Sequence, residues 1–146
     1  MQEYVEGFFE LVTLSDSDIV YDLGCGDGRL LFAALEKGAG RCVGIDLDSW
    51  ALSLARESAK AKGVEDHIVF IESDFMESDV SDATVLLCYL FPEAMRALEP
   101  KFETELKPGT RIVSEAFTFP DWKENKTIEV HHKRFHLYIM PPEPEK

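Results

Sequence analysis

The sequence predicts an α/β fold, with a mostly parallel seven-stranded sheet, an antiparallel hairpin at the C-terminal end and helices on both faces. Three observations predict it. Short apolar runs alternate with longer stretches of helical periodicity, which is typical of strand–helix–strand units. The first run leads through a glycine-rich turn into a helix. The last two runs follow one another with no helix between them, which indicates a hairpin.

The strands of this sheet are expected at apolar runs bounded by polar or glycine residues. The run over 68–71 is unbroken, which predicts a strand buried on both faces. The expected strands are 19–23, 41–45, 68–71, 83–89 and 111–115, followed by the hairpin strands 127–130 and 134–140.

Helices are expected between these strands, and one precedes the first strand. The N-terminal helix is amphipathic and should lie against the sheet or over a ligand. Pro100 should break or kink the last helix, and residues 141–146 should form an extended tail. The expected helices are 3–14, 30–37, one capped by Asp48 or Ser49 and ending near 62 before Gly63, and 92–105.

The turn after the first strand carries the motif D-x-G-x-G-x-G, formed by Asp22, Gly24, Gly26 and Gly28. Glycines suit such a turn because they adopt positive φ at little cost and allow a ligand to approach the backbone closely. In a parallel sheet this turn lies at the carboxyl edge, where ligands bind. The motif therefore predicts a nucleotide or nucleoside site.

The same stretch distinguishes two kinds of ligand. The dinucleotide fingerprint G-x-G-x-x-G needs a glycine where Arg29 stands, and its pyrophosphate would lie beside Asp22 and Asp27. Each carboxylate would repel that pyrophosphate by roughly 1 kcal/mol or more. S-adenosylmethionine (SAM) carries no phosphate, and its ammonium and sulfonium groups attract acidic residues. The loop therefore favours SAM, and its spacing resembles motif I of the Rossmann-like class I SAM-dependent methyltransferases.

A second acidic residue, Asp46, ends the next strand. It follows Asp22 at close to the ~20-residue interval at which doubly wound folds place a ribose-binding carboxylate. A carboxylate can accept hydrogen bonds from both ribose hydroxyls. The alternative role is a helix cap, but Asp48 fills that role better. We also assign Cys25, within the loop, and Leu47, directly after Asp46, to the cofactor site.

The ends of the third and fourth strands supply the remaining candidates. Asp74 should accept a hydrogen bond from the adenine amino group and Phe75 should cover the ring, although Phe75 could instead belong to the core. The fourth strand should end at the methyl group. Tyr89 is therefore assigned to both the cofactor and the catalytic site, and Phe91 and Pro92 to the catalytic site. The Asn-Pro-Pro-Tyr motif of many methyltransferases that act on bases or glutamine is absent.

Longer stretches resemble a smaller group, the non-SET protein-lysine methyltransferases, which include compact archaeal enzymes and a mitochondrial family. The resemblance covers roughly residues 20–122. It implies that Asp22, Gly24, Gly26, Asp46 and Asp74 bind SAM, that S-adenosylhomocysteine is the product, and that exposed lysines of proteins are methylated. The stretches that carry it are 89–93, 98–101, 106–114 and Trp122.

One stretch departs from this group. Its members have a proline-rich segment with an aromatic residue before the first helix, and here only Tyr4-Val5 is similar to it. We therefore expect a more open site or weaker substrate binding.

Methylation of lysine depends on positioning and on loss of a proton. At a reference pKa of about 10.4, about one lysine in a thousand is neutral at pH 7. Desolvation in an apolar channel can lower this pKa by up to about 3–5 units, so no catalytic base is required. Tyr89, Phe91, Phe117 and Trp122 are candidates for such a channel, with core packing as the alternative.

The net charge and the lengths of the apolar runs limit the kinds of partner that the protein is expected to bind. The net charge of −13 repels DNA and RNA, attracts cationic partners, and would also suit a generic solubilising surface. Residues 1–146 should form one domain. No apolar run approaches the length of a membrane span and no signal peptide precedes the first strand, so we expect no membrane partner and a cytoplasmic location.

No metal site is expected. Cys25, Cys42 and Cys88 lack metal-binding spacing, and the adjacent His131 and His132 should point to opposite sides of a strand.

Two alternatives to a lysine methyltransferase stay open. One is a small-molecule or RNA N-methyltransferase, although an RNA enzyme would be expected to have a basic patch. The other is a SAM-binding protein of weak catalytic activity that serves as the partner of another protein.

Overall fold

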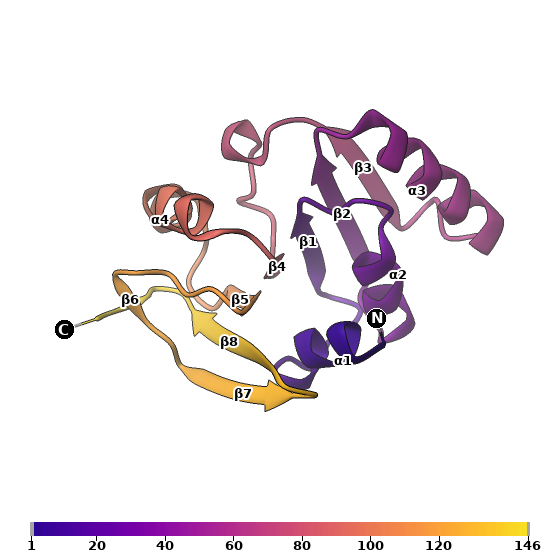
Figure 1. Cartoon of the computed structure of the whole chain (residues 1–146). Coiled ribbons are helices and arrows are strands. Elements are labelled where there is room, and N and C mark those ends of the chain that lie inside the picture. Colours follow the sequence, from indigo (N-terminus) through magenta and orange to yellow (C-terminus); the bar gives the residue numbers. More distant parts are fainter. Residues whose placement is uncertain (1, 146) are drawn as a thin grey trace.

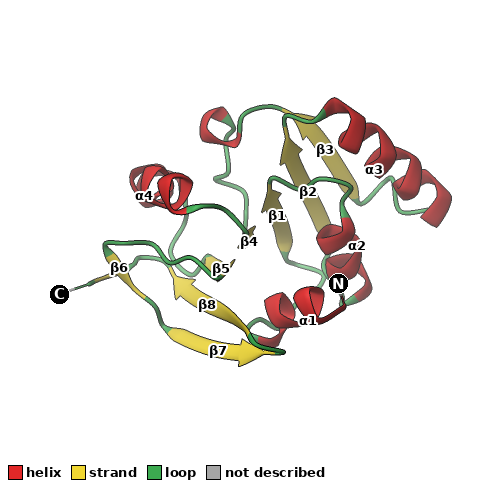
Figure 2. Cartoon of the chain, viewed as in Figure 1, coloured by secondary structure: helices red, strands yellow, loops and turns green. Residues whose placement is uncertain are grey.

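In the computed structural model of the chain, residues 2–145 are described, with side chains from residue 5 onward. A twisted sheet runs through the molecule (Figures 1 and 2). Its parallel strands are β1 (Ile19–Leu23), β2 (Arg41–Asp46), β3 (Ile68–Glu72), β4 (Val85–Cys88) and β5 (Arg111–Glu115), and its antiparallel hairpin is β7 (Lys126–Val130) and β8 (Lys133–Ile139). The order β3-β2-β1-β4-β5-β8-β7 confirms the expected seven-stranded sheet.

Helices cover both faces of the sheet, as expected. On one face lie α1 (Gln2–Glu10), α2 (Arg29–Glu36) and α3 (Ser49–Lys62), and their buried residues share a core with Val20, Leu87 and Phe135 of the sheet. On the other face lies α4 (Pro92–Glu105), which packs Met95, Leu98 and Phe102 against Leu86, Ile112 and Tyr138. Strand residues therefore alternate between the two cores, as the period of a strand requires.

The strand order places a ligand site at the carboxyl ends of β1 and β4. From β1 the chain runs outward to β2 and β3, then crosses back to β4 on the other side of β1. The connections after β1 and β4 therefore diverge and leave a crevice between them, which is the usual ligand site of an open parallel sheet.

One expectation about the sheet is wrong. The β3 strand is not buried on both faces, because it forms the edge of the sheet; Val69 and Ile71 are 43% and 39% exposed. Of the break or kink expected at Pro100, the break is absent, because α4 continues to Glu105; the kink stays a prediction. The other expected strands and the α3 helix, with Asp48 at its N-cap and Gly63 at its end, are confirmed.

The chain termini differ slightly from expectation. The α1 helix ends at Glu10 rather than near residue 14, and the side chain of Tyr4 lies outside the described residues. The C-terminal segment is extended, and its strand β9 (Glu143–Pro144) pairs with β6 (Trp122–Lys123). This small second sheet was not expected. Residues 141–146 contain three prolines, which is unusual for a segment that includes a strand.

The α1 helix approaches the sheet closely at Gly7. A methyl group at this position would overlap the ring of Phe135, a fully buried residue of β8. The Phe135 ring also meets Phe8 edge-on, with ring centroids 5.2 Å apart. Glycine is therefore required at this position by packing, although it is unfavourable in a helix by about 1 kcal/mol.

The Gly7→Ala variant should destabilise the protein by about 1–3 kcal/mol, because overpacking outweighs the gain in helix propensity. Urea denaturation measures the change. A Phe135→Leu background removes the ring atoms that clash, so the same Gly7→Ala change should cost less there. Equal costs in both backgrounds would show that α1 does not pack on Phe135.

Candidate functional site

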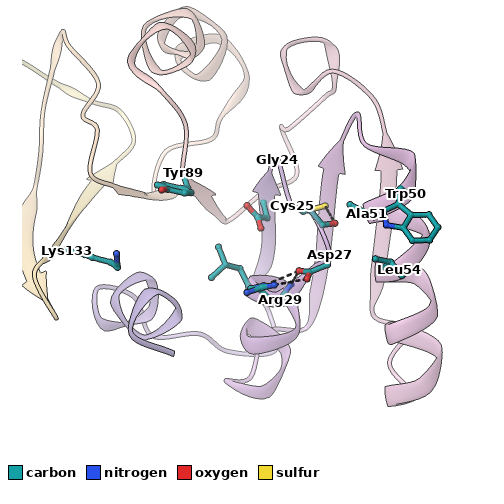
Figure 3. Close-up of a pocket in the computed structure, with 12 residues that line it drawn as sticks. Gly24, Cys25, Asp27, Arg29, Trp50, Ala51, Leu54, Tyr89 and Lys133 are labelled. Carbon is teal, nitrogen blue, oxygen red and sulfur yellow. Dashed lines mark hydrogen bonds and ion pairs between the residues drawn. The ribbon is translucent and has the colours of Figure 1, made fainter. Parts of the chain in front are cut away.

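A cavity of about 640 Å³ opens above the carboxyl ends of β1 and β4. Figure 3 shows Tyr89 and Lys133 on one side of it, Trp50 and Leu54 on the other, and the glycine loop between them. The expected cofactor residues that line the cavity are Asp22, Gly24, Cys25, Gly26 and Tyr89. Sequence motif and cavity therefore coincide.

The glycine loop is fixed by backbone contacts to β2. Gly24, Gly26 and Gly28 all have positive φ, of 82°, 57° and 88°. The N–H groups of Gly24 and Cys25 both donate to the carbonyl of Ile45, at 2.7 and 3.2 Å. The loop lies so close to β2 that a methyl group on Gly44 would be 2.6 Å from the Cys25 sulfur. Only a glycine at position 44 leaves room for the loop.

Asp46 joins the loop to the start of α3. One oxygen accepts a hydrogen bond from Gly26 N at 2.7 Å, and the other accepts one from Asp48 N at 2.9 Å. The helix cap itself is Asp48, which accepts from Trp50 N and Ala51 N. Each carboxylate oxygen can accept a second hydrogen bond, so Asp46 keeps capacity for ribose hydroxyls. The ribose contact stays a prediction.

Asp22 is a buried carboxyl group beside the cavity. It is 5% exposed and lies at the end of β1. Burial, together with the nearby Asp46 carboxylate, raises the pKa of Asp22 to about 7. A cationic ligand would lower this pKa, because it favours the ionised form. The site is therefore suited to a positively charged ligand and unsuited to a phosphate.

The remaining cofactor candidates, Leu47, Asp74 and Phe75, are not among the residues that line the cavity. Leu47, after β2, is 67% exposed. Asp74 caps the short helix η1 (Phe75–Glu77) by accepting a hydrogen bond from Met76 N at 2.9 Å. Phe75 is partly buried against the core on the α4 face, which agrees with its alternative role as a core residue. The adenine contacts of Asp74 and Phe75 stay predictions.

The aromatic side chains expected around the acceptor lysine, here called the acceptor wall, are partly in place. Tyr89 lines the cavity and is 57% exposed, and Phe91 is 76% exposed. Phe91 caps α4, whose first residue is Pro92, and its ring lies 5.9 Å from that of Phe117. Trp122 does not join this wall. It is buried at 3% exposure against Phe102, Phe119 and Tyr138, so of its two expected roles the structure shows core packing rather than a place in a channel.

Several lining residues were missed by sequence reasoning. Trp50, Ala51 and Leu54 come from the first turns of α3, which begins at the same edge of the sheet. Their place could have been inferred from Asp48, since a helix that begins after β2 presents its first turns to the crevice. Lys133 could not have been inferred, because it reaches the cavity only through the packing of the β7–β8 hairpin.

Other kinds of site find no support in the described residues. No group of three or more histidine, cysteine, aspartate or glutamate side chains within residues 2–145 could hold a metal ion. His131 and His132 lie in the hairpin turn, with φ of 51° and 69°, rather than on a strand. In this part of the chain, no helix is long and apolar enough to cross a membrane.

Comparisons with known proteins agree with the site. Residues 22–126 match the ANTKMT methyltransferase domain. A protein-lysine N-methyltransferase of Saccharolobus islandicus is 36% identical over 95% of this chain and 89% of its own length. The adenine nucleotide translocase lysine N-methyltransferase of Mus musculus is 33% identical, but the matched region covers 70% of this chain and only 44% of that protein.

Solved structures confirm the fold and the cofactor. An RNA methyltransferase from Salinibacter ruber, in complex with S-adenosyl-L-homocysteine, superposes with a TM-score of 0.92 at 34% identity, covering 97% of this chain and 92% of that one. The ribosomal protein L11 methylase of Lactobacillus delbrueckii shares the fold, with a TM-score of 0.75 at 15% identity over 93% of this chain and 76% of that one. With the acidic glycine loop and the cavity above β1 and β4, these matches show that the chain is a SAM-dependent methyltransferase and belongs to the ANTKMT methyltransferase domain family.

Proposed function

We propose that this enzyme methylates the ε-amino group of lysine side chains in other proteins. The observation that carries the proposal is an acidic cofactor cavity lined by the exposed ring of Tyr89, which is followed two residues later by the exposed ring of Phe91. The likeness to the archaeal protein-lysine N-methyltransferase, which extends over 95% of the chain, supports the same acceptor.

Some residues of the site serve the cofactor and others serve the acceptor. SAM, when bound, supplies an electrophilic methyl group. Asp22 offers the cofactor a buried carboxylate, and Asp46 holds the glycine loop in the shape that lines the cavity. On the acceptor side, Tyr89, Phe91 and Phe117 would exclude water from the lysine amine once the substrate protein covers them, which favours its neutral, nucleophilic form. Their π faces would also attract the ammonium form as it arrives.

The shape and charge of the protein suit a lysine presented by another protein. Tyr89 and Phe91 are more than half exposed, so the acceptor side is an open surface rather than an enclosed pocket for a small molecule. The net charge of −13 attracts lysine-rich surfaces and speeds their encounter with the enzyme. We also propose a reducing compartment such as the cytoplasm, since all three cysteines are free and buried.

RNA is the second acceptor to consider, because the Salinibacter ruber structure bears the name of an RNA methyltransferase. Affinity for RNA comes largely from lysine and arginine side chains that neutralise phosphates. The chain has 28 acidic and 15 basic residues. Two basic residues line the cavity, and one of them, Arg29, forms an ion pair with Asp27 at 2.9 Å. The charge therefore favours protein over RNA.

Incubation of a whole-cell lysate with the enzyme and methyl-labelled SAM should label proteins and leave RNA unlabelled. Protease treatment should release the label, nuclease treatment should not, and mass spectrometry should place the methyl groups on lysine. The Asp46→Ala variant, with its loop contact removed, is the background control. Label found only in RNA would contradict the proposal.

Asp22 should make SAM binding depend on pH. Its carboxyl group has a pKa of about 7, above its ordinary value, so it is mostly protonated at about pH 6 and mostly ionised at about pH 7.5. The ionised form attracts the cationic cofactor, so the Kd for SAM should decrease by up to about tenfold over this interval. Calorimetry measures Kd at each pH. Asp22→Asn should abolish this dependence; an equal dependence in both proteins would assign it to another group.

A further inference from the structure

A buried carboxylate beside the acceptor wall has no part in the site described above. Glu115 is the last residue of β5 and is 7% exposed. Among the described residues, none forms a hydrogen bond or a direct ion pair with its side chain. Among the described residues, His136 Nε2 is the one buried side-chain polar atom without a hydrogen-bond partner, so the Glu115 oxygens still reach solvent although the residue is mostly buried. The carboxylate can therefore bind a group that arrives from outside.

The register of the sheet places Glu115 next to Tyr89. Cys88 and Ser114 are partners in the parallel β4–β5 pair, so Tyr89 and Glu115 follow at the tips of neighbouring strands. Adjacent strands lie about 4.8 Å apart. The backbone turns at once after Glu115, because Ala116 has a φ of 72° and Phe117 N donates to the Glu115 carbonyl at 2.8 Å. This turn brings Phe117 to Phe91.

The same register directs Glu115 to the face that carries the cavity. Its partner in the β5–β8 pair is Phe135, whose side chain belongs to the core under α1. Directly paired strand residues share a face, and so does Lys133, two residues before Phe135 on β8. Lys133 lines the cavity, and Figure 3 shows its side chain pointing from β8 into it.

Lys133 provides the only counter-charge that acts appreciably on Glu115 among the described residues. Burial raises the pKa of Glu115, and the ammonium of Lys133 opposes part of that rise. The two groups form no direct ion pair. The negative charge of the carboxylate is therefore partly balanced by Lys133 from a distance, while its oxygens remain available to another group. A lysine ammonium from this chain thus already lies at the cavity, on the face of the sheet that carries Glu115.

We propose that Glu115 binds the amino group of the acceptor lysine, and that Lys133 is the counter-charge that this amino group displaces. The inference rests on the proposed function and names the side chain that selects and orients the acceptor. A carboxylate can accept hydrogen bonds from the N–H groups of a lysine in its charged or its neutral form. Once the ammonium has lost a proton to solvent, the neutral amine held in this way can direct its one lone pair at the methyl donor.

The test compares two variants that each remove one charge, Glu115→Gln and Lys133→Gln, with poly-L-lysine as acceptor and labelled SAM as donor. Glu129→Gln is the matched control, because it also removes one negative charge, at an exposed position of the β7–β8 hairpin. The KM for the acceptor, kcat, the Kd for SAM and the melting temperature are measured for each protein.

Glu115→Gln should raise the KM for poly-L-lysine about tenfold or more relative to Glu129→Gln, since a hydrogen bond to a charged group is lost, while the Kd for SAM is unchanged. Lys133→Gln should lower this KM about two- to fivefold, because the competing ammonium is gone. A KM for Glu115→Gln equal to that of the control would overturn the inference. If Glu115→Gln proves unstable, Lys133→Gln decides: a lowered KM supports the inference, and an unchanged or raised KM overturns it.

Failure of the proposed function gives a different result. If the wild-type protein binds SAM but methylates neither poly-L-lysine nor lysate proteins, both the lysine acceptor and the role of Glu115 are wrong. If the wild type methylates lysine and the Glu115 and Glu129 variants behave alike, only the role of Glu115 is wrong.

Discussion

The hydrogen bonds of the Asp46 carboxylate hold the site together. Through Gly26 N and Asp48 N, this one side chain connects the glycine loop after β1, the tip of β2 and the start of α3. Two of these segments line the cofactor cavity: the glycine loop, and α3, which supplies Trp50 and Leu54. The loop is further tied to β2 by the carbonyl of Ile45, and Gly44 gives it the room to lie there. Cavity shape and loop conformation therefore depend on the same few contacts.

This arrangement concentrates negative charge where a protein core would normally avoid it. Asp22 is buried near Asp46, and the repulsion between the two carboxylates adds to the burial that raises the pKa of Asp22. Such a pair is unfavourable in the free protein and favourable when a cation arrives, so the protein gives up some stability for binding. Glu115 repeats this principle on the acceptor side, at the tip of β5. In the proposed arrangement, the site presents carboxylates to two cationic partners, the cofactor and the lysine.

Much of the fold and of the cofactor loop could be predicted from sequence, because local patterns determine them. The D-x-G-x-G-x-G motif, the carboxylate after β2 and the cap of α3 are all encoded by neighbouring residues. What sequence reasoning missed depends on contacts between distant segments. The exposure of β3 follows from its place at the sheet edge, the burial of Trp122 from its packing with Phe119 and Tyr138, and the approach of Lys133 from the β5–β8 register. None of these pairings is visible in a local stretch of sequence.

A crystal structure of the protein with S-adenosylhomocysteine would test most directly whether the nucleoside binds above the tips of β1 and β2. We predict density for the nucleoside in the cavity formed by Asp22, Gly24 and Gly26, with the ribose hydroxyls hydrogen-bonded to Asp46. Density in another part of the molecule, or a ribose that makes no contact with Asp46, would contradict this prediction.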